Sequence, residues 1–182
     1  FYERVVGGST WHWNGTCLRF LPSDFCLYSR YGQGVDWPWG LEELQPFYRE
    51  AELELGVSGG AAMSALPPTL LDQVVGQAAR KIGVQVQVLP AARNSQTYQG
   101  RPACQGNASC FPICPIGAKY DATVHLRRAQ DLGVKLRSNS QVCRLVVQSQ
   151  QVVGLQVKEP SGCYLLQADY FVLAANAVET PR

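Results

Sequence analysis

Three cysteines lie within eleven residues of one turn-rich stretch, and no other feature of the chain constrains its fold as strongly. Their spacing is Cys104-x5-Cys110-x3-Cys114, and Pro115 follows the last of them. Residues 93–119 around them contain three prolines and three glycines, which interrupt helices and strands. The chain has seven cysteines in 182 residues, an odd number that internal disulfides cannot fully pair. The cluster therefore predicts a compact loop that gathers three thiols.

Three thiolates on one loop favour a site for a soft metal. Thiolates select iron–sulfur clusters or zinc, and proline directly after a ligating cysteine occurs in cluster-binding sequences. Three ligands suit a three-iron cluster, which lacks one corner iron. Structural zinc needs a fourth ligand and usually a tighter Cys-x2-4-Cys hook, and the nearest histidine, His125, falls in an expected helix. The spacing also leaves open a set of small buried thiols, or one disulfide with a spare cysteine.

Charge and hydropathy exclude other classes. The 16 Lys and Arg residues nearly balance 14 Asp and Glu, and no basic stripe is interleaved with aromatic residues, so a nucleic-acid partner is disfavoured. Apolar runs such as Tyr170–Ala175 are far too short to cross a bilayer. The first four residues do not resemble a secretory signal. Because the chain starts without methionine and stops where a helix is expected to begin, we expect a fragment of a longer protein.

Hydrophobic periodicity predicts a mixture of helices and strands. Apolar residues at helical spacing indicate three helices, at Leu41–Leu55, Thr69–Ile82 and near Ala122–Asp131. Alternating or continuous apolar runs indicate strands at Val84–Leu89, Val134–Leu136, Val142–Val147, Val152–Val157, Tyr164–Leu166 and Tyr170–Ala175. Residues 148–151 are expected to form a hairpin turn. The predicted fold class is therefore α/β (α+β).

The cysteine loop and five other segments resemble one enzyme family. The loop Gly100–Tyr120 is similar to the cluster loop of the iron–sulfur-containing branch of the glucose–methanol–choline (GMC) oxidoreductases. This branch includes the membrane-associated FAD glucose, gluconate, fructose and sorbitol dehydrogenases. The other segments resemble the same branch in the same order, and they are Gly7–Trp13, Arg19–Phe25, Tyr31–Pro38, Ala92–Ser95 and Phe171–Pro181. The resemblance covers essentially the whole chain.

The resemblance implies a fold in which a partial Rossmann-type FAD-binding domain is interleaved with part of a substrate domain. Residues 1–30 and 121–182 would belong to the FAD-binding domain, and residues 31–120 to the substrate-domain insertion with the iron–sulfur loop. The dinucleotide fingerprint G-x-G-x-x-G is absent from these 182 residues. Neither His12 nor His125 matches the family's catalytic histidine, which is expected C-terminal to this fragment. We therefore expect the fragment alone to be inactive.

The resemblance also carries cofactor positions onto this sequence. Gly7 and Gly8 match the glycine pair where the backbone approaches the flavin, although such a pair alone is most often a turn. His12 matches a position that bonds the flavin covalently in some relatives and only packs against it in others. The remaining positions are Thr10 and Asn14 beside the flavin ring, Val142 at the adenine, and Ala174 and Ala175 where the last strand passes the dinucleotide. Core packing would explain the side chains of the last three equally well.

The implied reaction joins FAD to a [3Fe-4S] cluster held by Cys104, Cys110 and Cys114. An alcohol carbon of a sugar, polyol or sugar acid would pass hydride to the flavin, and the electrons would leave through the cluster to a multihaem cytochrome c subunit. The resemblance further implies a small chaperone-like subunit that carries the export signal, and a location on the periplasmic side of the membrane. Two other classes stay open, a standalone iron–sulfur electron-transfer protein and a zinc-stapled interaction module.

Overall fold

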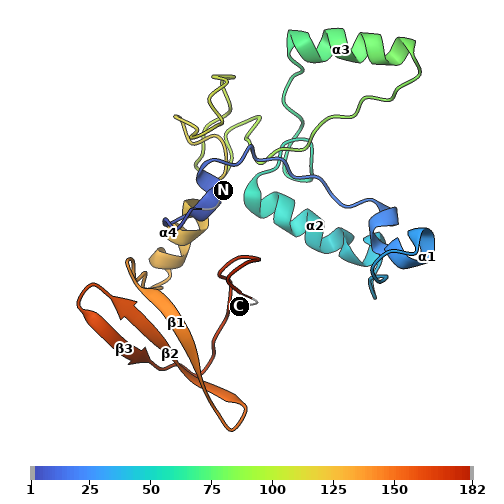
Figure 1. Cartoon of the computed structure of the whole chain (residues 1–182). Coiled ribbons are helices and arrows are strands. Elements are labelled where there is room, and N and C mark those ends of the chain that lie inside the picture. The colour runs from blue at the N-terminus through green and yellow to red at the C-terminus, as the bar shows by residue number, and fades with distance from the viewer. Residues whose placement is uncertain (1–2, 181–182) are drawn as a thin grey trace. The chain divides into compact units, whose positions relative to one another are not determined.

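The computed structural model describes residues 3–180, which form two compact units divided after Ala129. Each unit is described by itself below, and Figure 1 shows the elements of both. Pro181, the last residue of the closing motif that resembles the GMC family, lies outside the described residues. The helices and the one sheet confirm the predicted mixed α/β class.

The first unit contains the helices, joined by long irregular segments. Two short 3-10 helices and four α-helices follow in chain order, namely η1 (Gly8–Trp11), η2 (Pro22–Phe25), α1 (Leu27–Tyr31), α2 (Leu41–Leu55), α3 (Leu70–Lys81) and α4 (Thr123–Asp131). The three helices predicted from periodicity correspond to α2, α3 and α4. The short helices η1, η2 and α1 were not predicted, because four or five residues carry too little periodicity to be distinguished from turns.

The ends of α2 and α3 follow ordinary capping chemistry. The Glu43 carboxylate accepts the amide of Gly40 at 3.0 Å where α2 begins, and Gly56 ends this helix in the left-handed conformation, with φ of 70°. At α3 the Thr69 hydroxyl accepts the amide of Asp72 at 3.2 Å, and the Asp72 carboxylate accepts the amide of Thr69 at 2.8 Å. These contacts satisfy amides that the first turn leaves without intrahelical partners.

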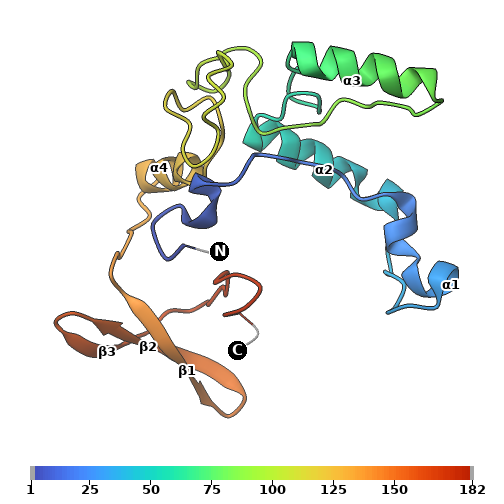
Figure 2. The same cartoon turned by 45° about the horizontal axis from the view of Figure 1, so that its top comes forward.

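The core of the first unit is a small crossing point built on the segment Ala91–Asn94. Backbone hydrogen bonds join this segment to three others, through Gly15, through Ser58 and through the pair Ala118 and Tyr120. The buried side chains at this crossing include Val57, Ser58, Ala91, Ala92, Asn94, Ala118, Lys119 and Tyr120. Small Gly and Ala residues allow four chain segments to meet closely here. This crossing point fixes the start and the end of the cysteine loop, and Figure 2 shows the ribbon in this region.

The second unit contains an antiparallel sheet in the order β1-β2-β3, formed by β1 (Gln141–Gln148), β2 (Gln151–Glu159) and β3 (Gly162–Leu166). Gln148 pairs with Gln151 across a two-residue turn in which Ser149 and Gln150 both have positive φ, 48° and 64°. Turns of this handedness match the twist of the strands they join. The predicted strands at 142–147, 152–157 and 164–166 and the hairpin turn at 148–151 are therefore confirmed.

Three predicted strands do not form. Residues 84–89, 134–136 and 170–175 are irregular, although each run has the composition of a strand. A strand is held by hydrogen bonds to a neighbouring strand, and the described part of the chain places none beside them. Figures 1 and 2 show residues 84–90 returning from α3 as an extended segment without a strand next to it. Between residues 3 and 180, no helix has the length and hydrophobicity needed to cross a membrane.

Candidate functional site

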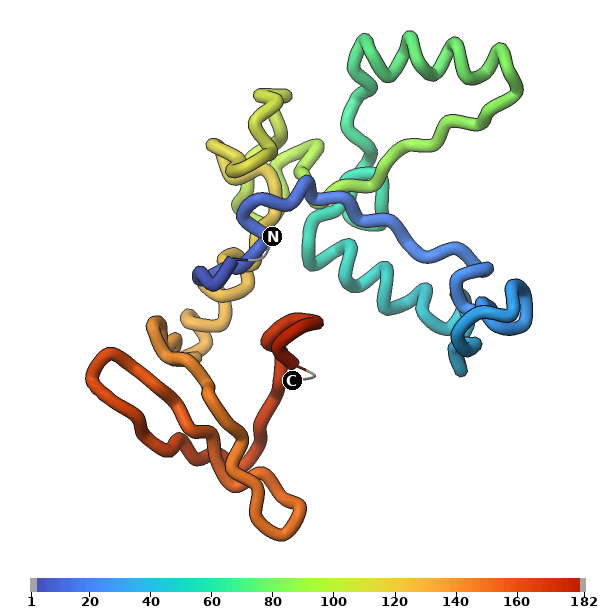
Figure 3. The backbone as a smooth tube through the Cα atoms, in the orientation of Figure 1, coloured from blue at the N-terminus to red at the C-terminus, as the bar shows by residue number. Residues whose placement is uncertain are grey.

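Both ends of the cysteine loop are fixed to the crossing point. The amide of Cys104 donates to the Asn94 carbonyl at 2.7 Å, and the amide of Asn94 donates to the Ala118 carbonyl at 3.0 Å. Arg93 and Lys119 pair through an isolated β-bridge. Residues 104–117 therefore leave the core and return to it at adjacent points, as the folded-back tube in this region of Figure 3 shows.

The three predicted thiols line one small depression in this loop. Its volume is about 10 Å³, and its walls are formed by Cys104, Gln105, Asn107, Ala108, Ser109, Cys110, Cys114, Pro115 and Ile116. Within residues 3–180, no three Cys, His, Asp or Glu side chains converge tightly enough to hold one metal ion. A cluster binds each thiolate through a different iron atom, so its ligands are spread more widely than those of a single ion. A cluster on Cys104, Cys110 and Cys114 therefore stays a prediction.

Hydrogen-bond donors point at all three sulfurs. The Arg93 guanidinium Nη1 lies 3.5 Å from the Cys110 Sγ, and the amide of Gly106 lies 3.5 Å from the Cys104 Sγ. Burial raises the pKa of the Cys114 thiol, but backbone amides of residues 116–119 outweigh burial, so that its pKa lies below the ordinary value. The backbone amides therefore stabilise the thiolate of Cys114, and the thiolate is the form of cysteine that binds a metal.

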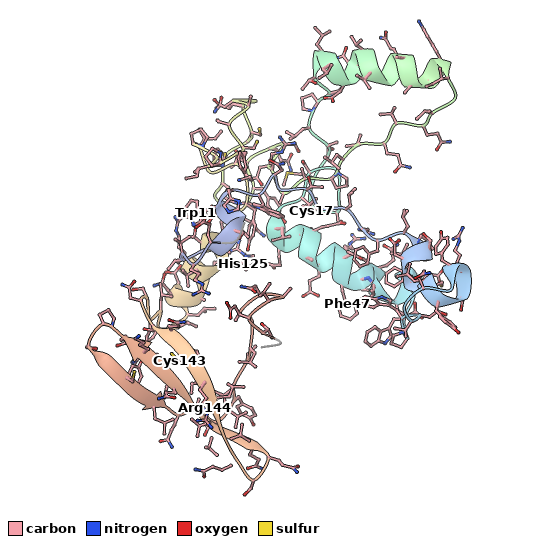
Figure 4. The ribbon with its side chains drawn as sticks, viewed as in Figure 1. Trp11, Cys17, Phe47, His125, Cys143 and Arg144 are labelled. Carbon is pink, nitrogen blue, oxygen red and sulfur yellow. The ribbon has the colours of Figure 1, made fainter. Side chains whose placement is uncertain are left out.

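His125 does not contribute to the cysteine depression. Its Nδ1 lies 2.7 Å from the Tyr120 hydroxyl, and its Nε2 lies 3.3 Å from the Glu54 Oε2. Both ring nitrogens therefore already have partners, Glu54 on α2 and Tyr120 just before α4. Figure 4 shows His125 on α4 and Trp11 on η1. The nearest histidine in the sequence is therefore not placed as a fourth ligand for zinc.

A second, larger hollow lies beside His12. It has a volume of about 340 Å³, within the range of small-molecule pockets, and it is lined by Glu3, Val5, Trp11, His12, Pro112 and Ile113. The Nε2 atom of His12 is buried and has no hydrogen-bond partner among residues 3–180. Buried polar atoms are rarely left unsatisfied, and an orphaned imidazole nitrogen at a hollow fits a ligand that supplies the missing contact. The His12 ring also meets the edge of Phe111, with ring centroids 6.2 Å apart.

The glycine pair before His12 is required by the backbone. Gly7 and Gly8 have φ of 94° and 55°, in the left-handed region that favours glycine. A Cβ on Gly7 would lie 2.7 Å from the Trp11 Nε1, so a side chain there would displace the indole. The tight turn explains both glycines without a cofactor, and their contact with flavin stays a prediction.

The other predicted cofactor residues have different surroundings. The Thr10 hydroxyl accepts the amide of Ala122 at 2.9 Å, so it ties η1 to the segment that leads into α4. Asn14 is exposed. Val142 lies on β1, an edge strand of the sheet, opposite Val157. Ala174 and Ala175 are exposed in an irregular segment, and the amide of Ala175 donates to the Thr180 hydroxyl at 3.0 Å. These last three residues belong to the second unit, so their roles at the dinucleotide also stay predictions.

Lys119 is the residue at this site that sequence reasoning missed. The residue is only 3% exposed. Its Nζ donates to the carbonyl oxygens of Trp11, Trp13 and Cys110 at 2.8, 2.7 and 2.6 Å. Lysine is almost never fully buried unless its charge has partners. No signal in the sequence marks it, because its acceptors are backbone carbonyl oxygens.

Comparison with known families assigns the chain to a class of flavin-dependent oxidoreductases. The sequence pattern of the GMC oxidoreductase family matches residues 2–182, and the chain belongs to this family. Family membership implies FAD as the cofactor. The orphaned His12 nitrogen and the 340 Å³ hollow fit such a group.

Individual relatives extend this assignment. The chain is 37% identical over 193 residues to the fructose dehydrogenase large subunit of Gluconobacter japonicus, an alignment that covers 97% of this chain and 36% of the relative. It is 32% identical to paromamine 6'-oxidase of Streptomyces fradiae, with 96% and 35% covered, and 25% identical to the gluconate 2-dehydrogenase flavoprotein of Pantoea cypripedii, with 93% and 35% covered. The chain thus spans about a third of the length of these relatives.

Proposed function

We propose that this chain is part of an FAD-dependent dehydrogenase that oxidises an alcohol group of a sugar, polyol or sugar acid and passes the electrons through an iron–sulfur cluster. The observation that carries the proposal is the single depression lined by Cys104, Cys110 and Cys114. It lies in a chain whose entire described length matches the GMC family. The relatives named for fructose and gluconate support a sugar or sugar acid as the substrate class.

The residues of this chain would hold and shield the cofactors. When bound, FAD supplies the acceptor for the hydride of the alcohol carbon. His12 lines the 340 Å³ hollow where the flavin would bind, and the tight turn at Gly7 and Gly8 precedes it. Cys104, Cys110 and Cys114 would hold the cluster, with Arg93 and the backbone amides stabilising their negative charge. The base that removes the hydroxyl proton corresponds to none of the residues carried over from the family.

A cluster on the cysteine loop would favour a dehydrogenase over an oxidase. Relatives with both names match this chain, so similarity alone leaves the electron acceptor open. An oxidase returns electrons from flavin to oxygen and needs no further carrier. A cluster beside the flavin would carry electrons one at a time to a multihaem cytochrome c subunit, which is the partner we propose. A small export subunit and a periplasmic location complete the proposal, and they rest on the resemblance to the iron–sulfur branch.

The first test measures metal content. The full-length protein, purified anaerobically with its partner subunits, is expected to contain iron and acid-labile sulfide. Cys104→Ser, Cys110→Ser or Cys114→Ser should lower iron at least tenfold and abolish electron transfer to cytochrome c, while FAD content and flavin reduction by substrate persist. Cys143→Ser and Cys163→Ser are matched controls, because these cysteines are exposed and lie outside the loop. Stoichiometric zinc without sulfide would contradict the proposal.

A further inference from the structure

Lys119 joins the two parts of the site that the proposed function uses. Two of its three acceptors, the carbonyls of Trp11 and Trp13, flank His12 in the sequence, and the third is the carbonyl of Cys110. The contacts connect residues separated by more than 100 positions in the chain. One buried ammonium therefore holds the loop of residues 8–14, called here the His12 loop, against the cysteine loop of residues 104–117.

A second contact joins the same two loops. The ring of Phe111, the residue after Cys110, meets the His12 ring at an interplanar angle of 81°. Pro112 and Ile113 then line the 340 Å³ hollow together with His12 and Trp11. The wall of the flavin-side hollow is thus formed in part by the cysteine loop itself, so a shift of either loop changes the other.

The charge of Lys119 lacks an equal and opposite partner among its direct contacts. All three acceptors are neutral carbonyl oxygens, and the side chain is buried, which is costly for a charged group. Burial lowers the pKa of Lys119, and negative charge on Cys110 and Cys114 acts in the opposite direction. Arg93, which reaches the Cys110 sulfur, adds a second cation. Negative charge near Lys119 comes from Asp121 as well as from Cys110 and Cys114.

We propose that Lys119 is a positioning residue for electron transfer, which fixes the His12 loop against the cysteine loop and whose charge favours the arrival of an electron on the group that the three cysteines hold. The proposal rests on the proposed function. One electron would pass from the reduced flavin to the cluster that the three cysteines would hold, and an external acceptor of the cytochrome class would later remove it. Lys119 gains and loses no proton in this step. Its fixed positive charge stabilises the added negative charge and so raises the reduction potential.

Hydrogen exchange tests the positioning role in the full-length protein. In the wild-type protein, we expect peptides 8–14 and 108–117 to open with the same free energy, as one cooperative unit. Lys119→Met should accelerate exchange in both peptides by at least tenfold. Lys81→Met is the matched control, since it removes the same charge from an exposed position on α3. Separate opening in the wild-type protein, or acceleration of only one peptide in Lys119→Met, would overturn the positioning role.

A redox titration tests the role of the charge. At a fixed solution potential, Lys119→Met should lower the ratio of reduced to oxidised cluster about tenfold, which for one electron is a shift of about 59 mV to more negative potential. Lys81→Met should leave the ratio unchanged. An unchanged ratio in Lys119→Met would refute the charge role. Wild-type protein that lacks iron and sulfide would instead refute the proposed function and the charge role with it, while the exchange experiment still decides the positioning role.

Discussion

His12 and Cys110 are far apart in the sequence, and two side chains, Phe111 and Lys119, bring their loops together. Phe111 packs against the His12 ring, Lys119 binds carbonyl oxygens of both loops, and Arg93 reaches the Cys110 sulfur. The sequence pointed to the cysteines through their spacing and to His12 through the resemblance to the GMC family. It did not point to Lys119, because the partners of Lys119 are backbone carbonyls, which leave no trace in residue identities.

At the residue scale, His12→Ala is expected to weaken FAD binding about tenfold. The Nε2 atom has no partner in the described part of the chain, so a bond to the flavin is the contact that would be lost, and one hydrogen bond contributes about 1.4 kcal/mol. FAD retained after gel filtration of the full-length protein measures the effect. If the imidazole is bonded covalently, acid-precipitated wild-type protein also keeps its yellow colour, and His12→Ala releases it.

The control for this variant is His125→Ala. The His125 ring lies against Tyr120 and Glu54 and away from the hollow beside His12, so its loss should leave FAD content unchanged. Equal FAD retention in His12→Ala and wild-type protein would show that His12 does not contact the flavin. It would also remove the basis for placing the flavin at the Gly7–Gly8 turn.

At the scale of elements, the buried Glu52 carboxylate is one of the groups that fix helix α2 to the rest of the first unit. Its carboxylate accepts two hydrogen bonds from the Arg19 guanidinium, at 2.6 and 2.8 Å, and one from the amide of Ala61 at 2.7 Å. These bonds, that from Arg19 foremost, hold the pKa of Glu52 below the ordinary glutamate value, although burial acts in the opposite direction. The Glu52 carboxylate therefore stabilises the fold fully at pH values above the ordinary glutamate pKa. This stabilisation is lost as the pH falls through the lowered pKa of Glu52.

Glu52→Gln is accordingly expected to lower the free energy of local opening of α2 by about 2 kcal/mol at pH 7, the range for hydrogen bonds to charged groups. The difference from wild-type protein should shrink as pH falls through the lowered pKa of Glu52, because protonation removes the same charge. Amide exchange of α2, corrected for intrinsic rates, measures it. Glu50→Gln, on the exposed face of the same helix, is the control. A difference that does not depend on pH would contradict this explanation.

Elements that depend on local chemistry were predictable, and those that depend on distant partners were not. Helix α2 follows from its apolar spacing and from Gly56, and the β1–β2 hairpin follows from alternation around a polar turn. The Val84–Leu89 and Tyr170–Ala175 runs have equally strong strand composition, yet they remain irregular. A strand exists only with a neighbour, and the described residues supply none to either run.

At the scale of the whole molecule, the chain spans about a third of the length of these relatives. Its own residues form two adjoining candidate binding sites. The cysteine depression and the His12 hollow share the loop of residues 104–117 as a common wall. The order of the motifs was visible in the sequence. Their adjacency was not, because it depends on how the segment Ala91–Asn94 gathers three other segments around it.

The central claim is that electrons pass from flavin to a cluster on the three cysteines, and anaerobic reduction of the full-length protein by substrate tests it most directly. The protein is mixed with sugars, polyols and sugar acids while flavin absorbance and the iron–sulfur spectrum are recorded together. We expect an active substrate to reduce the flavin first and the cluster afterwards, and Cys114→Ser to retain only the first phase. Flavin reduction with no iron–sulfur signal, followed by reoxidation by oxygen as fast as by cytochrome c, would contradict the account.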